Sequence, residues 1–387
     1  MSPVNCPATI EVFGCLVIGG VVRLALWSAC LLGAVSCVSR TDAGEVMTWE
    51  KLPAIPDAEG FAGTFAGVSN GALIVAGGAN IAGEKWGETF RKQWHDSVFV
   101  LEKPDGEWRG GLPPEASKEV GGSLRFRLPR ALGYGVSVTT ERGVVCIGGS
   151  DSQRHHADVF MLEWRDGHIV TTALPALPKP CANACGALAG KVIYVAGGIE
   201  TPDATTAMKT FWKLDLAAVE PRWEALDPWP GPERMLAVAG STGDSFFIFS
   251  GALLSAGADG KPVREFLRDA YRFTPGKGWT RIADLPRAAV AAPSPALRGA
   301  GMRLLIVSGD DGANVNFTPV REHPGFPRDV IAYDPERDSW TGAGEVPLSR
   351  ATVPTVRWLG HEVIPNGEVR PRVRTPEVWA ARMKLVK

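Results

Sequence analysis

The chain has 387 residues and a formal net charge of −1, from 41 Lys and Arg against 42 Asp and Glu. The charges are scattered, and no basic run or acidic tail indicates nucleic acid as a partner. We therefore expect a small, neutral or singly charged ligand. The 45 Gly and 30 Pro residues are typical of many short strands joined by tight turns.

An apolar segment near the N-terminus predicts export. Residues 12–37 are apolar apart from Arg23, and Leu24 to Ser36 has the composition of a signal-peptide h-region. The small residues before Cys37 resemble a bacterial lipoprotein box, although Ala34 stands where that box usually has Leu.

From this segment we expect a signal or lipoprotein leader over 1–36 and a short linker over 37–45. The mature protein would begin near Cys37, whose lipidation would attach it to a membrane. Its location would then be outside the cytoplasm, in the periplasm or anchored as a lipoprotein. The alternative is an uncleaved anchor helix, which Arg23 would interrupt.

The rest of the chain is organised by a repeat. An apolar run of β type ends in a pair of small residues, and copies follow one another at about 50 to 70 residues, a spacing typical of kelch-type propeller blades. The six pairs are Gly77-Gly78, Gly148-Gly149, Gly197-Gly198, Ser250-Gly251, Ser308-Gly309 and Asn366-Gly367. We interpret them as blade architecture rather than a phosphate loop, because Gly permits positive φ and close approach of blades.

Each blade should have four antiparallel strands, the second ending at the small pair and the fourth carrying a Trp. The expected inner strands are 61–68, 133–139, 184–188, 236–241, 291–297 and 352–358. The expected second strands are 73–76, 144–147, 192–196, 246–249, 304–307 and 361–365. The expected third strands are 97–101, 159–164, 210–214, 270–273, 330–333 and 377–382. The expected fourth strand begins at 107–108 in the first blade, and in the next four blades the fourth strands are expected at 169–172, 223–226, 279–282 and 340–343.

The sixth blade lacks a fourth strand at the C-terminus. The segment Val46 to Leu52, which contains Trp49, looks like a fourth strand without its first three. Pairing these ends would remove two exposed edges. The predicted fold is therefore all-β, a six-bladed kelch-type propeller over 46–387 whose N-terminal strand closes the last blade. A seven-bladed ring would need about 40 further residues.

No metal site is expected. Cys181-x-x-x-Cys185 has no matching second pair, so we expect these thiols and Cys146 to be buried small residues. Galactose oxidase shares the kelch repeat but uses copper held by Tyr and His, and the six His of this chain show no ligand spacing repeated across blades. His155-His156 follows Asp151 in a loop, where a surface role is expected.

A propeller gathers loops from every blade around one axial mouth. Polar residues just after a second strand, or at the start of an inner strand, can converge there. The candidates are Asn80, Arg130, Asp151, Arg154, Asn183, Glu200, Arg234, Asp310, Arg350, Glu368 and Arg374.

Two segments carry a resemblance to a known family. Asn366-Gly367-Glu368-Val369-Arg370-Pro371-Arg372-Val373-Arg374-Thr375 resembles the Asn-Gly-Glu-x-Lys-Pro-Gly-Leu-Arg-Thr segment of bacterial N-acetylneuraminate epimerases, the sialic acid mutarotases. The run from Gly63 to Ala79 is similar to their Gly-Phe-Ala-Gly-Ile-Ser-Asn…Ala-Gly-Gly-Ala run. The two segments stand here in reversed order, as in the family's cyclically permuted branch.

The resemblance implies a mutarotase in which Glu368 is the proton acceptor and Arg374 is a motif arginine. Interconverting sugar anomers requires ring opening and reclosure, and one positioned carboxylate can act first as base and then as acid. No metal or organic cofactor is required. Arg372 stands where the family has Gly, which leaves the identity of the acidic sugar open.

A guanidinium group can bind the carboxylate of sialic acid bidentately. Arg374 is the first candidate for this role. The further substrate-binding candidates are Arg130, Arg234, Arg350, Asn80 and Asn183.

Two other functions remain open. A kelch propeller can bind a glycan or a protein without catalysis, and the fold alone does not exclude this. Sialidases are also propellers, and Ser308-x-Asp310-x-Gly312 is similar to part of their Asp-box, but the Thr-Trp that follows in the box is absent.

Overall fold

The computed structural model describes residues 45–81, 83–87, 90–111 and 126–385. The predicted leader, Cys37 and most of the predicted linker lie outside these residues. Within them the helical element is η2 (Val320–Glu322), and no helix is long and apolar enough to cross a membrane.

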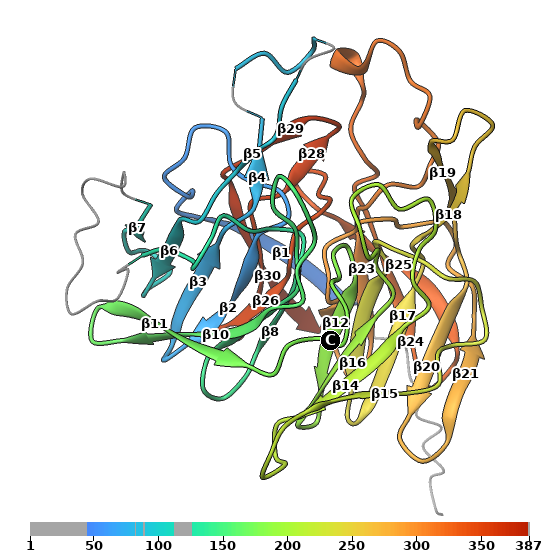
Figure 1. Ribbon diagram of the computed structural model, residues 1–387, viewed down its shortest axis with the longest axis horizontal. Helices are drawn as coiled ribbons and strands as arrows, with labels where there is room; N and C mark the ends of the chain where they lie inside the picture. The colour runs from blue at the N-terminus through green and yellow to red at the C-terminus, as the bar shows by residue number, and fades with distance from the viewer. Residues whose placement is uncertain (1–44, 82, 88–89, 112–125, 386–387) are drawn as a thin grey trace, which may run out of the picture. The chain divides into compact units, whose positions relative to one another are not determined.

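Six four-stranded antiparallel sheets form the blades of a propeller (Figure 1). Blade 1 comprises β2 (Phe65–Ser69), β3 (Ala72–Ala76), β6 (Val98–Leu101) and β7 (Arg109–Gly110); blade 2 comprises β8 (Val136–Thr139), β9 (Val144–Ile147), β10 (Val159–Arg165) and β11 (His168–Leu174). Blade 3 comprises β12 (Cys185–Ala189), β13 (Val192–Ala196), β14 (Phe211–Asp215) and β15 (Trp223–Ala225).

The remaining blades follow the same order. Blade 4 comprises β16 (Val238–Thr242), β17 (Ser245–Phe249), β20 (Ala270–Thr274) and β21 (Gly278–Ile282). Blade 5 comprises β22 (Leu297–Arg298), β23 (Leu304–Val307), β24 (Asp329–Asp334) and β25 (Ser339–Glu345). Blade 6 comprises β26 (Val356–Trp358), β27 (His361–Pro365), β30 (Val378–Leu385) and β1 (Glu45–Leu52).

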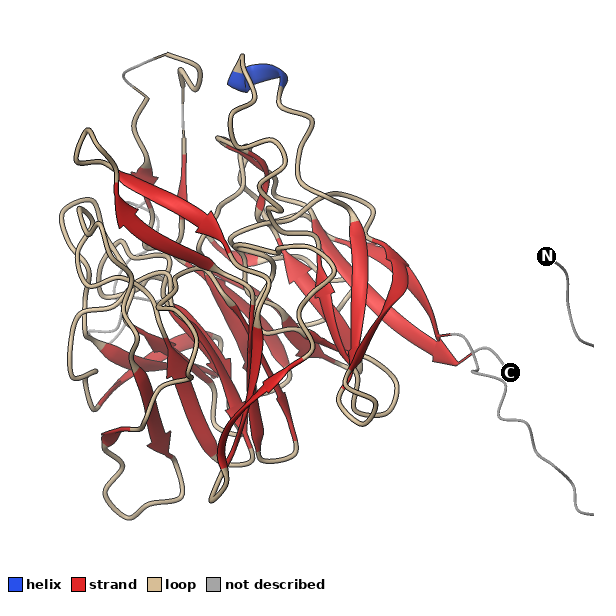
Figure 2. Ribbon diagram, turned by 90° about the vertical axis from the view of Figure 1, so that its right-hand side faces the viewer, coloured by secondary structure: helices blue, strands red, loops and turns tan. Residues whose placement is uncertain are grey.

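Three two-stranded hairpins stand on one side of the blades, the upper side in both ribbon views (Figures 1 and 2). They are β4 (Ala79–Asn80) with β5 (Gln93–Trp94), β18 (Ala252–Ala256) with β19 (Pro262–Phe266), and β28 (Glu368–Arg370) with β29 (Val373–Arg374). The η2 segment rises on the same side (Figure 2). The candidate site lies on this side.

The all-β propeller and the position of nearly every strand confirm the predicted fold. The inner strand of blade 6 was expected over 352–358, but only Val356–Trp358 pairs as a strand. The inner strand of blade 5 was also predicted too long. Residues 291–297 were expected there, but only Leu297 and Arg298 pair as a strand. Pro293 and Pro295 interrupt this segment, and proline has no N–H with which to join a ladder.

Each second strand is buried on both faces because it packs between two neighbouring blades. In β3, Ile74 faces the apolar residues of blade 2, whereas Leu73 and Val75 pack with Trp358 of blade 6. The side chains of Leu73, Ile74 and Val75 are fully buried. Burying such a side chain stabilises the fold by about 1.5 to 3 kcal/mol, so blade-to-blade packing is the main apolar contribution.

A closed ring of backbone hydrogen bonds joins the six blades at the axis. We call its members the axial ring; in blade order they are Gly63, Tyr134, Asn183, Leu236, Ala291 and Thr352. The N–H of each member donates to the carbonyl of the member in the preceding blade, over 2.6 to 2.8 Å, and Gly63 donates to Thr352 to complete the circle. All six residues have left-handed φ, between +54° and +66°.

The paired small residues also connect blades. The N–H of Gly78 donates to the carbonyl of Leu132, at the start of blade 2, over 2.8 Å. In four further pairs the second residue likewise donates its N–H to a carbonyl at the start of the next blade. The second position of every pair is Gly, with φ between +82° and +113°, whereas the first has φ between +54° and +67°. The first position therefore tolerates Ser or Asn, as in Ser250, Ser308 and Asn366, because short polar residues are compatible with the left-handed region.

The N-terminal strand closes the ring as predicted. β1 pairs antiparallel with β30 along its whole length, from Glu45 opposite Leu385 to Leu52 opposite Val378. The indole Nε1 of Trp49 donates to the carbonyl of Glu345 in blade 5 over 2.9 Å. The segment therefore completes one blade and contacts another.

Removing β1 should destabilise the whole propeller. A variant that begins at residue 53 loses the β1–β30 ladder and the packing of Trp49 and Leu52, and we expect a loss of about 3 to 5 kcal/mol in the free energy of unfolding. Denaturant unfolding followed by tryptophan fluorescence measures it. The control begins at residue 43 and keeps β1. Equal unfolding midpoints for the two would show that closure contributes nothing.

Candidate functional site

Five members of the axial ring form the floor of a large polar cavity among the described residues. This cavity, which we call the mouth, has a volume of about 790 Å³ and lies against Tyr134, Asn183, Leu236, Ala291 and Thr352 of the ring. A smaller cavity of about 70 Å³ follows the inner strands and contacts all six ring members. The loops of the upper side surround the mouth, which is a place where loops from different blades can hold one ligand.

One position per blade forms a rim around this floor. In each blade, the residue before the axial-ring member pairs with the residue that follows the small pair. The residues that follow the small pairs make up the rim, and they are Ala79, Ser150, Ile199, Ala252, Asp310 and Glu368. Four of the six therefore have no ionisable side chain. The two carboxylates, Asp310 and Glu368, lie in the consecutive blades 5 and 6, and both line the mouth.

Glu368 begins the β28–β29 hairpin and is positioned by it. The backbone N–H of Arg372 donates to Glu368 Oε1 over 2.8 Å, and Arg374 Nη1 lies 3.5 Å from the same oxygen. The Glu368 side chain is 17% exposed and that of Arg374 only 4%. The carboxylate thus faces the mouth, with a cation behind it.

Arg374 does not line the mouth, contrary to its expected role as the first carboxylate binder. Its Nε and Nη1 atoms are buried and have no hydrogen-bond partner among the described residues. The guanidinium of Arg374 forms an ion pair with the carboxylate of Glu368. Arg374 and the N–H of Arg372 therefore hold the Glu368 carboxylate in place at the mouth.

Arg372 occupies the position where the resembled segment has Gly, and the structure gives the reason for that Gly. The residue has φ +69° in the turn between β28 and β29, a conformation that favours glycine. Its side chain leaves the mouth and stacks on Phe90, with Cζ 3.8 Å from the ring centroid. Its Nη1 also donates to the carbonyls of Lys85 and Gly87 over 3.0 and 3.4 Å.

Arg370, two residues earlier, contacts two loops. Its Cζ lies 5.7 Å from the ring of Trp86, and its Nη1 donates to the carbonyl of Arg321 in η2 over 2.9 Å. The β28–β29 hairpin is therefore fastened to the loop of blade 1 by Arg372 and to the loop of blade 5 by Arg370. These contacts position the loops beside the carboxylate of Glu368.

The cations that line the mouth differ from those expected. They are Arg91 and Lys92 from the blade 1 loop and Arg264 from β19, all exposed. Lys92 Nζ lies 4.5 Å from the ring centroid of Tyr134, which meets Trp94 edge to face at 5.4 Å. Sequence reasoning missed these residues because they lie in loops and hairpins that follow no repeat.

Asp151 and the two histidines after it are also part of the site. Asp151 lines the mouth; burial raises the pKa of its carboxyl, but N–H donation from Arg154 and Gln153 and the contact with His156 outweigh this and lower it to about 2. His155 lines the mouth, is 7% exposed, and has no partner for either ring nitrogen among the described residues. Burial lowers the pKa of His155. The expected surface role of His155-His156 is therefore wrong.

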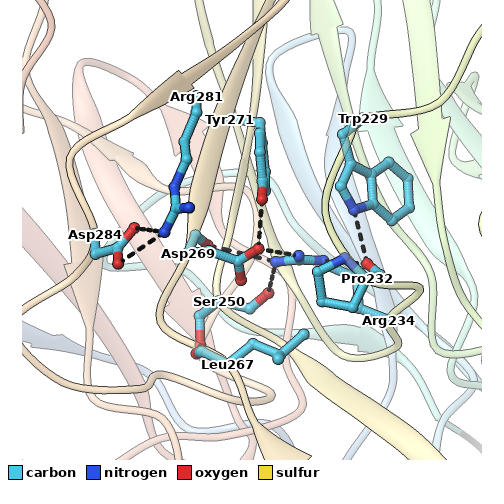
Figure 3. Close-up of polar contacts among 9 residues, drawn as sticks. All are labelled: Trp229, Pro232, Arg234, Ser250, Leu267, Asp269, Tyr271, Arg281 and Asp284. Atoms are coloured by element: carbon cyan, nitrogen blue, oxygen red, sulfur yellow. Dashed lines mark hydrogen bonds and ion pairs between the residues drawn. The ribbon is translucent and has the colours of Figure 1, made fainter.

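Arg234 is a correction to the expected substrate-binding set. Its side chain is wholly buried, and Figure 3 shows it enclosed by residues of blade 4 and the segment before it. Nη2 pairs with Asp269 Oδ2 over 2.6 Å, and Nη1 donates to the carbonyl of Ser250 over 2.8 Å. Tyr271 donates to the same carboxylate over 2.8 Å. The guanidinium donors of Arg234 are therefore used in hydrogen bonds within the fold. The backbone carbonyl of Arg234 accepts a hydrogen bond from the N–H of Gly198 in blade 3.

Arg350 is the second correction, for the same reason. Its side chain is wholly buried, and Nη1 donates to the carbonyl of Ser349 over 3.1 Å. The backbone carbonyl of Arg350 accepts from the N–H of Gly309 in blade 5. Burial lowers the pKa of Arg350 to about 10. Arg234 and Arg350 occupy equivalent positions between blades, which the sequence could not distinguish from mouth positions.

Of the other three residues expected to bind substrate, one lines the mouth and two do not. Asn183 lines the mouth as a member of the axial ring. Asn80 is buried and binds His95 Nε2 over 2.9 Å. Arg130 contacts His156 Nδ1 over 2.9 Å and Asp158 over 3.4 Å, so it reaches the mouth only through His156 and Asp151.

Replacing Arg372 should loosen the blade 1 loop. Arg372→Ala and Arg372→Gly both remove the contacts with Phe90, Lys85 and Gly87, so amide exchange in 83–87 and 90–94 should quicken about tenfold. Only Arg372→Gly also relieves the positive φ, worth about 1 kcal/mol. It should therefore unfold at a higher denaturant concentration than Arg372→Ala. Unchanged exchange in both variants would contradict the fastening role.

Comparison with known proteins agrees with this architecture. A family model described as NANM: N-acetylneuraminate epimerase matches residues 33–171. The N-acetylneuraminate epimerase of Haemophilus influenzae (strain PittEE) is 26% identical over 226 residues, 52% of this chain and 57% of the relative. That of Yersinia pestis (strain Pestoides F) is 28% identical over 234 residues, 54% of this chain and 57% of the relative.

The chain thus spans a little over half the length of the curated relatives it matches. A solved structure described as "Structure of YjhT" superposes with a TM-score of 0.59 and 14% identity, covering 84% of this chain and 96% of the other. At that identity the likeness concerns the fold. In sequence the chain resembles the N-acetylneuraminate epimerase family, and in fold it shares the propeller of that solved structure.

Proposed function

We propose that this protein is a mutarotase that interconverts the anomers of N-acetylneuraminate or a close acidic sugar. One observation carries the proposal: the carboxylate of Glu368 lines the mouth and is held by Arg374 and by the N–H of Arg372. Glu368 and Arg374 are the residues that the resemblance assigns to proton transfer and to the motif arginine. The family model covers 33–171, so this assignment rests on the motif and the geometry.

The geometry supports acid–base chemistry at one carboxylate. Ring opening removes the proton of the anomeric hydroxyl, forms the keto group and breaks the bond to the ring oxygen. Glu368 accepts that proton and passes it to the released ring oxygen, and the two transfers run in reverse when the ring recloses on the other face. A positioned general base contributes about 10² to 10⁴ in rate.

The lining of the mouth suits an acidic sugar. Its carboxylate can pair with Arg91, Lys92 and Arg264, since guanidinium and ammonium groups bind carboxylates strongly. Trp94 and Tyr134 offer aromatic surface for the apolar face of the ring. A volume of about 790 Å³ is within the range of small-molecule sites.

Glu368→Gln should abolish most of the activity without unfolding the protein. The amide keeps the size but cannot accept the proton, so anomer exchange of freshly dissolved α-N-acetylneuraminate should slow by about 10² to 10⁴. Proton NMR of the two anomers measures the rate, with the spontaneous rate subtracted. The matched control is Glu322→Gln, an exposed carboxylate of η2 outside the mouth, which should keep the wild-type rate.

Two outcomes would overturn the proposal. Full exchange by a folded Glu368→Gln variant would remove Glu368 from the chemistry. A wild-type protein that binds the sugar but leaves the spontaneous rate unchanged would favour the non-catalytic glycan-binding propeller.

We further propose that the protein is exported and held at a membrane through a lipidated Cys37. The support is in the sequence: Arg23 precedes the apolar run Leu24 to Ser36, and small residues precede Cys37. One acyl chain alone binds membranes weakly, so stable anchoring would need a further chain. An exported mutarotase would meet sugars before their uptake.

Mass spectrometry of the membrane fraction tests this location. We expect a mature chain that begins at Cys37 and carries a lipid mass, and Cys37→Ser should release the protein or leave the leader uncleaved. A cytosolic product that retains 1–36 would contradict export.

A further inference from the structure

We propose that Asp310 is a second catalytic carboxylate, the acid that supplies the proton to the ring oxygen while Glu368 accepts the proton of the anomeric hydroxyl. This inference rests on the proposed anomer exchange. It assigns the two proton transfers of that reaction to two residues, one from blade 5 and one from blade 6.

The symmetry of the propeller singles out Asp310. The rim has one position per blade, set by the pairing of that position with the residue before the axial ring. Asp310 pairs with Val290, and Glu368 pairs with Ala351. The backbone therefore presents the two carboxylates equivalently, from adjacent blades, above the same floor. The four other rim positions hold side chains that cannot transfer a proton at neutral pH.

The environments of the two carboxylates differ in the way that separate acid and base roles require. Glu368 pairs with Arg374 over 3.5 Å and accepts a hydrogen bond from the N–H of Arg372 over 2.8 Å. Asp310 has one described hydrogen bond to its side chain, from the N–H of Gly312 over 3.0 Å. The ionisable groups that act on it are Asp311 on its own segment, His323 beyond η2 and Arg264 on β19. Burial is the largest effect and raises the pKa of Asp310; Asp311 adds to this, while the N–H of Gly312, His323 and Arg264 act in the opposite direction without outweighing it.

The proton balance closes with these two groups alone. In ring opening, ionised Glu368 takes the hydroxyl proton, the O–H electrons form the C=O bond, and the bond to the ring oxygen breaks. That oxygen takes the proton of neutral Asp310. After rotation about the bond next to the keto carbon, ionised Asp310 recovers the proton as the oxygen attacks the other face, and neutral Glu368 protonates the carbonyl oxygen. Both carboxyl groups return to their starting states.

The test is the pH profile of anomer exchange by the full protein. A reaction with an ionised base and a neutral acid gives a bell-shaped profile. The rate falls at low pH as Glu368 gains a proton and at high pH as Asp310 loses its own. Asp310→Asn should lower kcat about 10- to 100-fold, leave KM within about threefold and remove the high-pH limb. Asp310→Glu, which keeps an acid, should recover part of the rate.

Asp311→Asn is the matched control. Asp311 is the neighbouring carboxylate and does not line the mouth. Its substitution should keep the maximal rate and move the high-pH limb to lower pH, because a negative charge that raises the pKa of Asp310 is gone.

The outcomes separate this inference from the proposed function. If wild type exchanges anomers and a folded Asp310→Asn variant keeps the rate and both limbs, Asp310 is not the acid, and Glu368 acts alone. If Asp310→Asn raises KM with kcat unchanged, Asp310 binds substrate and the inference is wrong. If wild type shows no exchange with any acidic sugar, the proposed function itself fails.

Discussion

The hydrogen-bonded axial ring is the constraint on which the rest of the structure depends. Six consecutive N–H to carbonyl bonds, each 2.6 to 2.8 Å, close on themselves only if six blades are present and the last one meets the first. Each member must adopt left-handed φ to present both its N–H and its carbonyl along the circle. A buried backbone group left unpaired is costly, so the loss of any blade would expose the ring on two sides. The strand β1 contributes at the outer edge, where it pairs with β30 and completes the last blade.

The ring also decides where chemistry can occur. It closes the floor of the mouth and gives each blade one rim residue. Small or apolar rim residues leave space for a ligand, while Asp310 and Glu368 put two carboxylates on adjacent blades. The hairpins and loops above the rim add cations and aromatic surface. A scaffold fixed by backbone bonds can therefore vary its side chains without losing the geometry of the site.

The strands could be predicted because local sequence determines them. Runs such as Leu73 to Ala76 are apolar on both faces, and only a strand packed between two blades accommodates them. The small pairs marked the ends of second strands, even in the copies with Ser or Asn. Glu368 was found through the motif around it, and it does line the mouth. The strand predicted over 291–297 was too long because the prediction followed the apolar pattern of this segment and disregarded its two prolines, which cannot donate a hydrogen bond to the ladder.

By itself the sequence determined the number of blades, the closure of the ring and the segment that carries Glu368, since these follow from a repeat and a motif. Only the tertiary structure decided which polar residues meet. Arg234 and Arg350 point into the packing between blades, and Arg374 lies behind Glu368. Arg91, Lys92 and Arg264 reach the mouth from loops of different blades. The direction of a side chain around a closed ring depends on contacts between blades distant in sequence, which no local pattern encodes.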